Sequence, residues 1–320
     1  MTTAITKFNG VDHYGQPLAS ENFETSLLLF SQWAMLGIGA FSNVRINNAP
    51  SGIASHSADP SRLRLVRDPR YVSGRVWEGA RSDWVWETGV EYPHQPISIS
   101  GVYVNNNFIP KGQTGSSGYV ISYPEGKIVF NSPIASGSKV QCEYSNRSVK
   151  IINGSQSWFN QLIINSYNSA DPHFMQSASG TWDVLSKNRI QLPAMIIEAI
   201  PKVNFYPLEL GNLSRKHQQE VVITILAETS YDRNQIHDIV AYQWQKRIMG
   251  VDRRKLTEDR KYPLNYDGSV SASGIQYPQM VNGNYAWQQI RFENLKSREI
   301  EVPNPLFGCE IRLTCESDLP

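Results

Sequence analysis

Catalytic signatures are the first thing that this sequence lacks. Its 320 residues contain no GxGxxG dinucleotide pattern, no P-loop, no GxSxG nucleophile turn, no HExxH zinc pattern and no EF-hand loop. None of the six histidines lies at zinc-ligand spacing from a pair of cysteines. The sequence therefore predicts no catalytic residue, no cofactor and no metal site, and it favours a protein that is not an enzyme.

Cysteine is scarce, and its spacing gives no disulfide framework. Cys142, Cys309 and Cys315 are an odd number, and the last two lie six residues apart in one strand-like run. A strand rises about 3.3 Å per residue, whereas bridged Cα atoms lie about 5.5 Å apart, so these two cannot pair along that strand. We interpret all three as reduced core residues.

Charge and long apolar runs are also limited. Charged residues make up 18% of the chain, and 30 basic residues against 29 acidic ones leave a formal charge of +1. This balance indicates no polyanionic partner, and the basic runs at 62–75 and 253–255 are expected to serve subunit contacts or solvation rather than DNA binding. No apolar run approaches ~20 residues and the start lacks a signal peptide, so we expect no membrane partner and synthesis in the cytoplasm.

What the sequence does contain is an antiparallel β module at residues 91–152. Short alternating runs (ISGVYVNN, GYVISY, KIVF and KVQCEY) are separated by turn residues, as at Pro124-Glu125-Gly126. Alternation with period two is typical of half-buried strands, and Pro followed by Gly between two such runs predicts a hairpin.

Residues 1–90 are expected to form a first segment with one helix. A helix is predicted from Ser20 to Leu36, with Phe23, Leu27 and Phe30 on its buried stripe and Gly37 at its end. A strand at FSNVRI and a polar loop from Asn47 to Pro60 follow. Then Trp77, Trp84 and Trp86 lie close together, and they either stack on sugars or bases or, as we favour, pack a junction or a subunit contact.

The third segment, residues 153–320, is expected to be an α/β sheet domain. Apolar runs near 192–211 and 218–229 predict central strands, and a helix is predicted from Asp232, as its N-cap, to Met249. WQQIRFENL and FGCEIRLTCE predict paired final strands. The last strand alternates, with Cys309, Ile311, Leu313 and Cys315 inward and Glu310, Arg312, Thr314 and Glu316 outward. WFNQLIINSY is consistent with a short strand or helix, and KLTEDRKYPLNYDGS with a polar loop. The fold class is therefore α+β and β-rich: an N-terminal helix, a central antiparallel β module and a C-terminal α/β sheet domain.

Acids near the tryptophans give the one enzymatic interpretation that the sequence offers. Glycosidases need two carboxylates at a fixed separation beside aromatic platforms, and acids are scattered through this region: Asp59, Asp68, Glu78, Asp83, Glu87 and Glu91. Histidine and aspartate also occur together at 12–13 and 171–173, where an acid–base pair would require the fold to bring them to one site. They occur again at 237–238, where a solvated helix face is favoured.

Several segments resemble structural proteins of contractile-tailed bacteriophages, of the cyanophage-type myoviruses. In the β module these are GVYVNN, GYVISYPEGKIVF and SKVQCEYSNRSVKI, and RVWEGARSDWVWETGV before it is similar to an aromatic and acidic stretch that precedes such modules. The late helix DRNQIHDIVAYQWQKRIMGVD and the strand CEIRLTCE resemble neck and tail-terminator proteins.

The resemblance implies a virion structural protein in an oligomeric ring at the head–tail neck or collar, or at the tail end as a tail terminator or sheath-contacting ring. Its partners would be itself, as a hexamer or dodecamer, and other phage neck and tail proteins, with DNA passing the lumen without specific binding. The alternative is a receptor- or carbohydrate-binding module of a baseplate or fibre, although the internal repeats usual in fibres are lacking.

Overall fold

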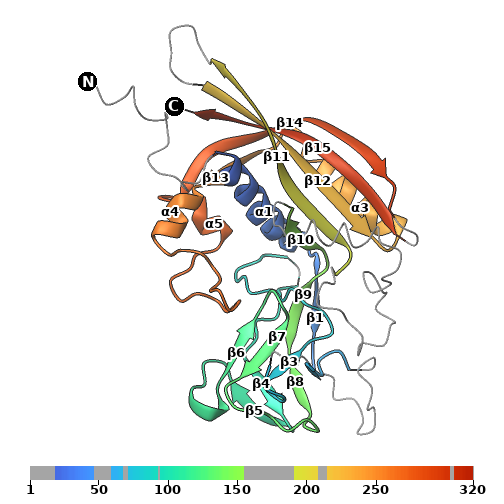
Figure 1. Ribbon diagram of the computed structural model, residues 1–320, viewed down its shortest axis with the longest axis vertical. Helices are drawn as coiled ribbons and strands as arrows, with labels where there is room; N and C mark the ends of the chain where they lie inside the picture. Colours follow the sequence, from blue (N-terminus) through green and yellow to red (C-terminus); the bar gives the residue numbers. More distant parts are fainter. Residues whose placement is uncertain are drawn as a thin grey trace. The chain divides into compact units, whose positions relative to one another are not determined.

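The protein is an α+β chain in which strands dominate (Figure 1). The computed structural model describes residues 19–46, 59–67, 71–92, 94–154, 191–207, 215–302 and 306–319. The helices in these ranges include none with the length and hydrophobicity needed to cross a membrane. Most of the polar loop predicted at 47–60, and the WFNQLIINSY segment, lie outside the described residues.

The chain divides into two compact units. The first unit consists of Met1–Ser31, Ile151–Lys261 and Ile275–Pro320, and the second of Gln32–Lys150 and Tyr262–Gly274. The predicted boundary at residue 152 lies close to this division. The predicted boundary at residue 90 falls inside the second unit, because the Trp-rich segment and the β module share one hydrophobic core.

The first unit is built on one six-stranded sheet with the order β10-β11-β12-β15-β14-β13. Its strands are β10 (Lys150–Asn153), β11 (Ala194–Pro207), β12 (Arg215–Ala227), β13 (Arg247–Val251), β14 (Ala286–Ile300) and β15 (Phe307–Leu319). The pairs β11–β12, β12–β15, β14–β15 and β13–β14 are antiparallel. The long strands twist strongly across the sheet in Figure 1.

The final strand alternates as its sequence predicts. Its odd-numbered residues from Cys309 to Cys315 are buried, whereas Arg312 is exposed. Glu316 was expected to point outward into solvent, but it is buried, because Lys216 lies 2.5 Å from its carboxylate and the Gln218 amide also donates to it. Alternation therefore shows which side chains share a face of the sheet, but not whether a side chain on that face is buried.

Helix α1 (Ala19–Gly37) matches the helix predicted at 20–36. Phe23 and Leu27 are buried, as the apolar stripe predicts. Within the first unit, the Phe23 ring meets the rings of His217 and Trp287 edge-on at centroid distances of 5.0 and 5.1 Å. Phe30 makes similar edge contacts with Tyr277 and Phe292 at 6.0 and 6.4 Å. The apolar stripe thus covers part of the sheet.

Helix α3 (Ser230–Ala241) is shorter than the predicted helix at 232–249. It packs against β12 and β15 (Figure 1). Thr229, rather than Asp232, is the N-cap, and the chain leaves the helix after Ala241. Gln245 has a left-handed φ of 62°, and its N–H donates to the Phe292 carbonyl, so pairing with β14 overrides the helical pattern. The final part of the predicted helix is strand β13.

Two short helices complete the first unit. Helix α4 (Arg253–Glu258) begins two residues before the KLTEDRKYPLNYDGS segment predicted as a polar loop and extends into it. The Asp252 carboxylate caps this helix by accepting from the Lys255 N–H. Helix α5 is Tyr277–Met280. Leu256 and Met280 are buried, so each short helix contributes one core side chain.

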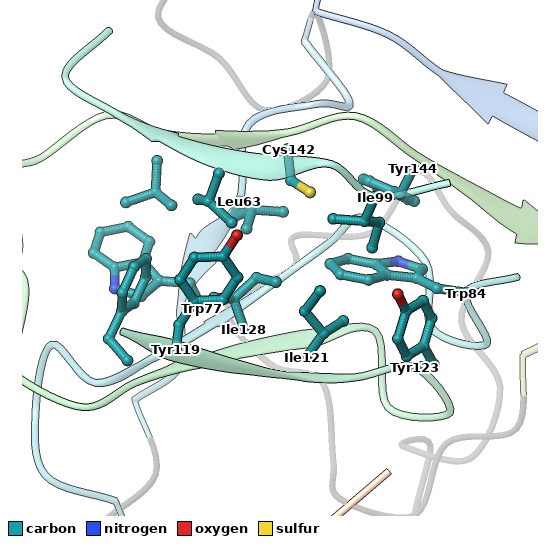
Figure 2. Packing of buried hydrophobic residues seen from close by; sticks show 13 residues of the cluster. Leu63, Trp77, Trp84, Ile99, Tyr119, Ile121, Tyr123, Ile128, Cys142 and Tyr144 are labelled. Atoms are coloured by element: carbon teal, nitrogen blue, oxygen red, sulfur yellow. The ribbon is translucent and has the colours of Figure 1, made fainter. Parts of the chain in front are cut away.

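The second unit packs small antiparallel sheets around an aromatic core. One sheet has the order β2-β3-β7-β6, another β5-β4-β8, and β1 pairs with β9. Their bounds are β1 (Phe41–Val44), β2 (Arg64–Leu65), β3 (Val76–Glu78), β4 (Gly101–Val104), β5 (Asn107–Pro110), β6 (Tyr119–Ser122), β7 (Lys127–Phe130), β8 (Val140–Cys142) and β9 (Tyr144–Arg147), with a 3-10 turn at Gly115–Ser117. Figure 2 shows the core side chains between strands on two sides.

One turn of the β module was predicted from the sequence and another was not. The predicted hairpin at Pro124-Glu125-Gly126 joins β6 to β7, and Gly126 supplies the positive φ of 64°. Strand β5 was not predicted. Asn105 and Asn106, with φ of 50° and 68°, form a two-residue turn that pairs β5 with β4.

Candidate functional site

The tryptophans chosen from the sequence lie mainly inside the second unit. Trp84 is fully buried and stacks on Tyr144 at a centroid distance of 4.3 Å (Figure 2), and Trp77 is also buried. The Trp84 indole N–H donates to the Arg81 carbonyl at 2.9 Å, and that of Trp77 to Gly74 at 3.0 Å. Trp86 is half-buried against the same core. Trp77 and Trp84 therefore have no exposed ring face for a sugar, a base or another subunit.

Two of the six acids near the tryptophans meet at a buried arginine. Arg147 on β9 forms a very short ion pair with Glu87, and its Nε lies 3.7 Å from an oxygen of Asp83. The side chains of Arg147 and Glu87 are each 4% exposed, and that of Asp83 is 18% exposed. A second Arg147 nitrogen donates to the Gln32 carbonyl at 3.2 Å. We call these three side chains the Arg147 cluster.

The backbone holds Asp83 firmly in this cluster. Its φ of 61° lies in the left-handed region, which aspartate tolerates better than most residues. Its N–H donates to the Pro124 carbonyl, and its own carbonyl accepts from the Arg147 N–H, both at 3.0 Å. The left-handed residue thus brings the carboxylate and the arginine together through main-chain bonds.

Burial and pairing act on the pKa values of the Arg147 cluster in opposite directions. Burial raises the pKa of Asp83 above its usual range, although the positive charges of Arg147 and Lys150 oppose this. Burial would lower the pKa of Arg147, but the carboxylates of Glu87 and Asp83 raise it above its ordinary value. The guanidinium therefore stays charged and neutralises buried carboxylate.

The Arg147 cluster does not have the geometry that glycoside hydrolysis requires. Two carboxylates would have to flank a space that admits a sugar and water, whereas the Glu87 carboxylate is buried against Arg147. Asp59 accepts from the Ser61 hydroxyl and the Gln141 amide, and Glu78 pairs with Arg64 at 2.6 Å. Glu91 is exposed, and Asp68 lies outside the described residues. The arrangement is thus suited to holding the fold.

Histidines give no metal site in the described part of the chain. There, no three residues among His, Cys, Asp and Glu are grouped to hold a metal. His237 lies on α3 with its Nδ1 3.1 Å from a carboxylate oxygen of Asp238. The histidine and aspartate pairs at 12–13 and 171–173 lie outside the described residues.

The three cysteines are free and buried, as the sequence predicts. Burial raises the pKa of Cys142, Cys309 and Cys315, so each stays a thiol at neutral pH. A buried thiol is a poor nucleophile. These side chains act as small apolar core residues.

Sequence reasoning did not find a buried polar group in the sheet of the first unit. His217 pairs with Ser317 across β12 and β15, Gln219 pairs with Cys315, and all four side chains are buried. Burial lowers the pKa of His217 to about 4, so its ring is neutral at pH 7 and packs against Phe23. Only the strand register brings these residues together, which explains why the sequence did not reveal them.

Helix α1 also covers part of the edge strand β13. The Ser26 hydroxyl accepts from the Val251 N–H at 2.8 Å and donates to the Asn22 carbonyl at 2.5 Å. The Asn22 side-chain oxygen accepts from the Arg253 N–H at 3.1 Å. A free strand edge can pair with another chain. These bonds close the end of β13, so association there has to use side chains.

The surface of the first unit combines paired charges with exposed aromatic rings. Arg298 lies 2.9 Å from Glu310, and Arg312 lies 2.5 Å from the same carboxylate. Three aromatic side chains are nevertheless largely exposed: Tyr231 at 72%, Tyr242 at 87% and Trp244 at 57%. Exposed aromatic residues are typical anchors of protein interfaces, so these three residues are the candidate contact residues of the first unit.

Comparisons with known proteins add no family. No protein-family model matches this chain, and no curated protein matches it.

Proposed function

We propose that this chain is a virion structural protein that assembles into an oligomeric ring at the head–tail neck or collar of a contractile-tailed phage, or at its tail end. Its role would be that of a tail terminator or of a ring that contacts the sheath. The resemblance in sequence is the reason for proposing a phage particle and this position of the protein within it. The observation that carries assembly is the group of exposed aromatic side chains on a unit whose other large side chains are mostly buried.

The distribution of polar chemistry supports the same proposal. The most deeply buried acids of the second unit are bound by arginine, hydroxyl and amide groups, and the cysteines are buried thiols. The edge strand β13 is closed at one end by Ser26, which limits uncontrolled strand pairing. Each subunit of a ring binds its neighbours through two different surfaces, so defined side-chain contacts suit such an assembly better than an open strand edge does.

Quantitative mass spectrometry of purified particles tests the proposal. The copy number of this chain is counted against that of the portal protein in the same particles. About six or twelve copies per particle are expected for a ring of this kind. A copy number of many dozens would place the chain in sheath, shell or fibres, and particles without any of its peptides would refute a virion role.

Receptor or carbohydrate binding is the second candidate, and Tyr266 is the observation that favours it. This residue is fully exposed in a turn of the second unit, which is held by the Asn265 N–H donating to the Ser269 carbonyl at 2.8 Å. An exposed aromatic ring on a rigid turn suits stacking on a sugar. A glycan array would show saturable binding that Tyr266→Ala removes. Trp84→Ala is a poor test, because Trp84 is part of the core.

A further inference from the structure

A basic aromatic surface lies where α3 turns into the edge strand β13. It consists of Tyr242, Trp244, Arg247 and Met249, and we call it the 242–249 patch. Tyr242 and Trp244 are 87% and 57% exposed, and Met249 is 39% exposed. Arg247 is exposed and forms no ion pair with the described residues. Tryptophan, tyrosine and arginine are the residues most enriched at the centres of protein interfaces.

The turn that carries Trp244 is rigidly held. The Trp244 N–H donates to the Ala241 carbonyl at 3.2 Å, and the Lys246 N–H donates to the Gln243 carbonyl at 2.9 Å. The Gln245 N–H and the Phe292 carbonyl are 2.9 Å apart and tie the turn to β14. A side chain on such a turn loses little conformational freedom on binding, so the patch is preorganised for a partner.

An acidic surface lies at the other end of α3, where β12 and β14 end. Ala227 pairs with Phe307 and Ile300 pairs with Gly308, so the residues that follow β12 and β14 lie on either side of the start of β15. The next residues are Glu228 and Glu301, both exposed, and they form no ion pair among the described residues. We call the surface made by Glu228, Tyr231 and Glu301 the 228–301 corner.

The two surfaces are complementary in charge and alike in their aromatic content. The 242–249 patch presents arginine with two aromatic rings, and the 228–301 corner presents two carboxylates with Tyr231, which is 72% exposed. They lie toward opposite ends of α3, whose twelve residues span about 18 Å. Because of this separation, the patch and the corner of one copy cannot contact each other, whereas the patch of one copy can contact the corner of a second copy.

We propose that the 242–249 patch of one copy docks on the 228–301 corner of the next. The two surfaces are different, so the contact is heterologous, and repeated contacts of this kind generate a ring when the rotation between copies closes. Trp244 would be the buried anchor, and Arg247 would meet the carboxylates of Glu228 and Glu301. The inference rests on the proposed ring and identifies the surfaces that build it.

Charge exchange in the full-length chain tests the contact, with association followed by sedimentation velocity. Arg247→Glu and the double variant Glu228→Lys/Glu301→Lys are each expected to weaken self-association at least tenfold. Combining the three substitutions reverses the charge on both surfaces and so restores their attraction. The triple variant is therefore expected to regain most of the lost affinity of self-association. Circular dichroism verifies that each variant is folded.

Trp244→Ala tests the anchor, with Tyr266→Ala as the matched control because Tyr266 is an exposed aromatic residue of the other unit. Trp244→Ala is expected to weaken association at least tenfold, as for an interface anchor, and Tyr266→Ala to leave it unchanged. Folded variants that all associate like the original chain would overturn this contact while leaving the ring proposal intact. An original chain that stays monomeric at tens of micromolar would also overturn the contact, and the particle copy number would then decide the ring proposal separately.

Discussion

Removing the charge of Arg147 is expected to destabilise the second unit strongly. In Arg147→Met the side chain keeps its length and loses its charge, so the Glu87 carboxylate, 4% exposed, remains buried without its arginine. The bond from Arg147 to the Gln32 carbonyl is lost as well. Removing one partner of a buried ion pair typically costs about 3–5 kcal/mol. Against a usual total stability of about 5–15 kcal/mol, this loss is large.

Two further variants separate this effect from a general loss of surface charge. Arg147→Met/Glu87→Leu replaces the pair with apolar side chains and is expected to recover at least half of the lost stability, because no uncompensated Glu87 charge then remains. Lys127→Met removes the 2.8 Å ion pair with Glu125, whose side chain is 55% exposed. That exposed pair is expected to contribute less than about 1 kcal/mol.

Urea unfolding monitored by tryptophan fluorescence measures these differences, because Trp77 and Trp84 are buried in the same unit. The loss in Arg147→Met is expected to depend on pH. The pKa of Asp83 is already raised by burial, and removing the arginine raises it further. An aspartate whose pKa is raised in the folded state lowers stability when it is charged, and this penalty disappears when it is protonated in both states. The loss of stability in Arg147→Met should therefore be largest near pH 7 and shrink as the pH falls toward about 3.9, the pKa of aspartate in an unfolded chain. A deficit below about 1 kcal/mol, or one unaffected by pH and by the second substitution, would refute a buried charge cluster.

Three other changes test separate parts of the fold. Gly126→Ala would place a Cβ 2.7 Å from a backbone oxygen at φ +64°, whereas Gly89→Ala meets nothing within 4 Å at φ +74°, so thermal unfolding should show the larger loss for Gly126. Ser26→Ala removes the acceptor of the Val251 N–H and should cost about 1–3 kcal/mol, with faster hydrogen exchange at Val251. With its pKa lowered to about 4, His217 should make stability fall as pH drops below about 6.5, and His217→Gln should flatten that fall in pH-dependent denaturation.

The sequence predicts those elements whose signals are local. The alternation in the final strand needs only residues 309–315, and the helix at 20–36 has its apolar stripe and its terminal glycine within one segment. The hairpin at 124–126 is specified by its own proline and glycine. In each case local preference and tertiary packing favour the same structure, which is the condition for a sequence pattern to be sufficient.

Where the sequence-based prediction was wrong or incomplete, a distant segment decides. The helical pattern runs on to Met249, but main-chain bonds between residues 245–246 and Phe292 draw that part into the sheet. Glu87 and Arg147 are 60 residues apart in the sequence, and no pattern in either segment predicts that they pair. The sequence favoured Trp84 packing a junction or a subunit contact without separating the two, and cross-strand contacts from several elements place it in the core beside Tyr144.

The Arg147 cluster and the two surfaces at the ends of α3 place charge in different surroundings, and this difference leads to a last prediction. In the second unit, Arg147 neutralises carboxylates in the interior, whereas in the first unit Arg247 and the carboxylates of Glu228 and Glu301 stay exposed at opposite ends of α3. Exposed charges attract over about 10 Å at 0.1 M salt and about 3 Å at 1 M. Self-association through these surfaces should therefore weaken as salt rises, and then level off where the apolar contact of Trp244, which salt does not screen, sustains it. Sedimentation in a salt series measures both phases, and association indifferent to salt would exclude the charged contact.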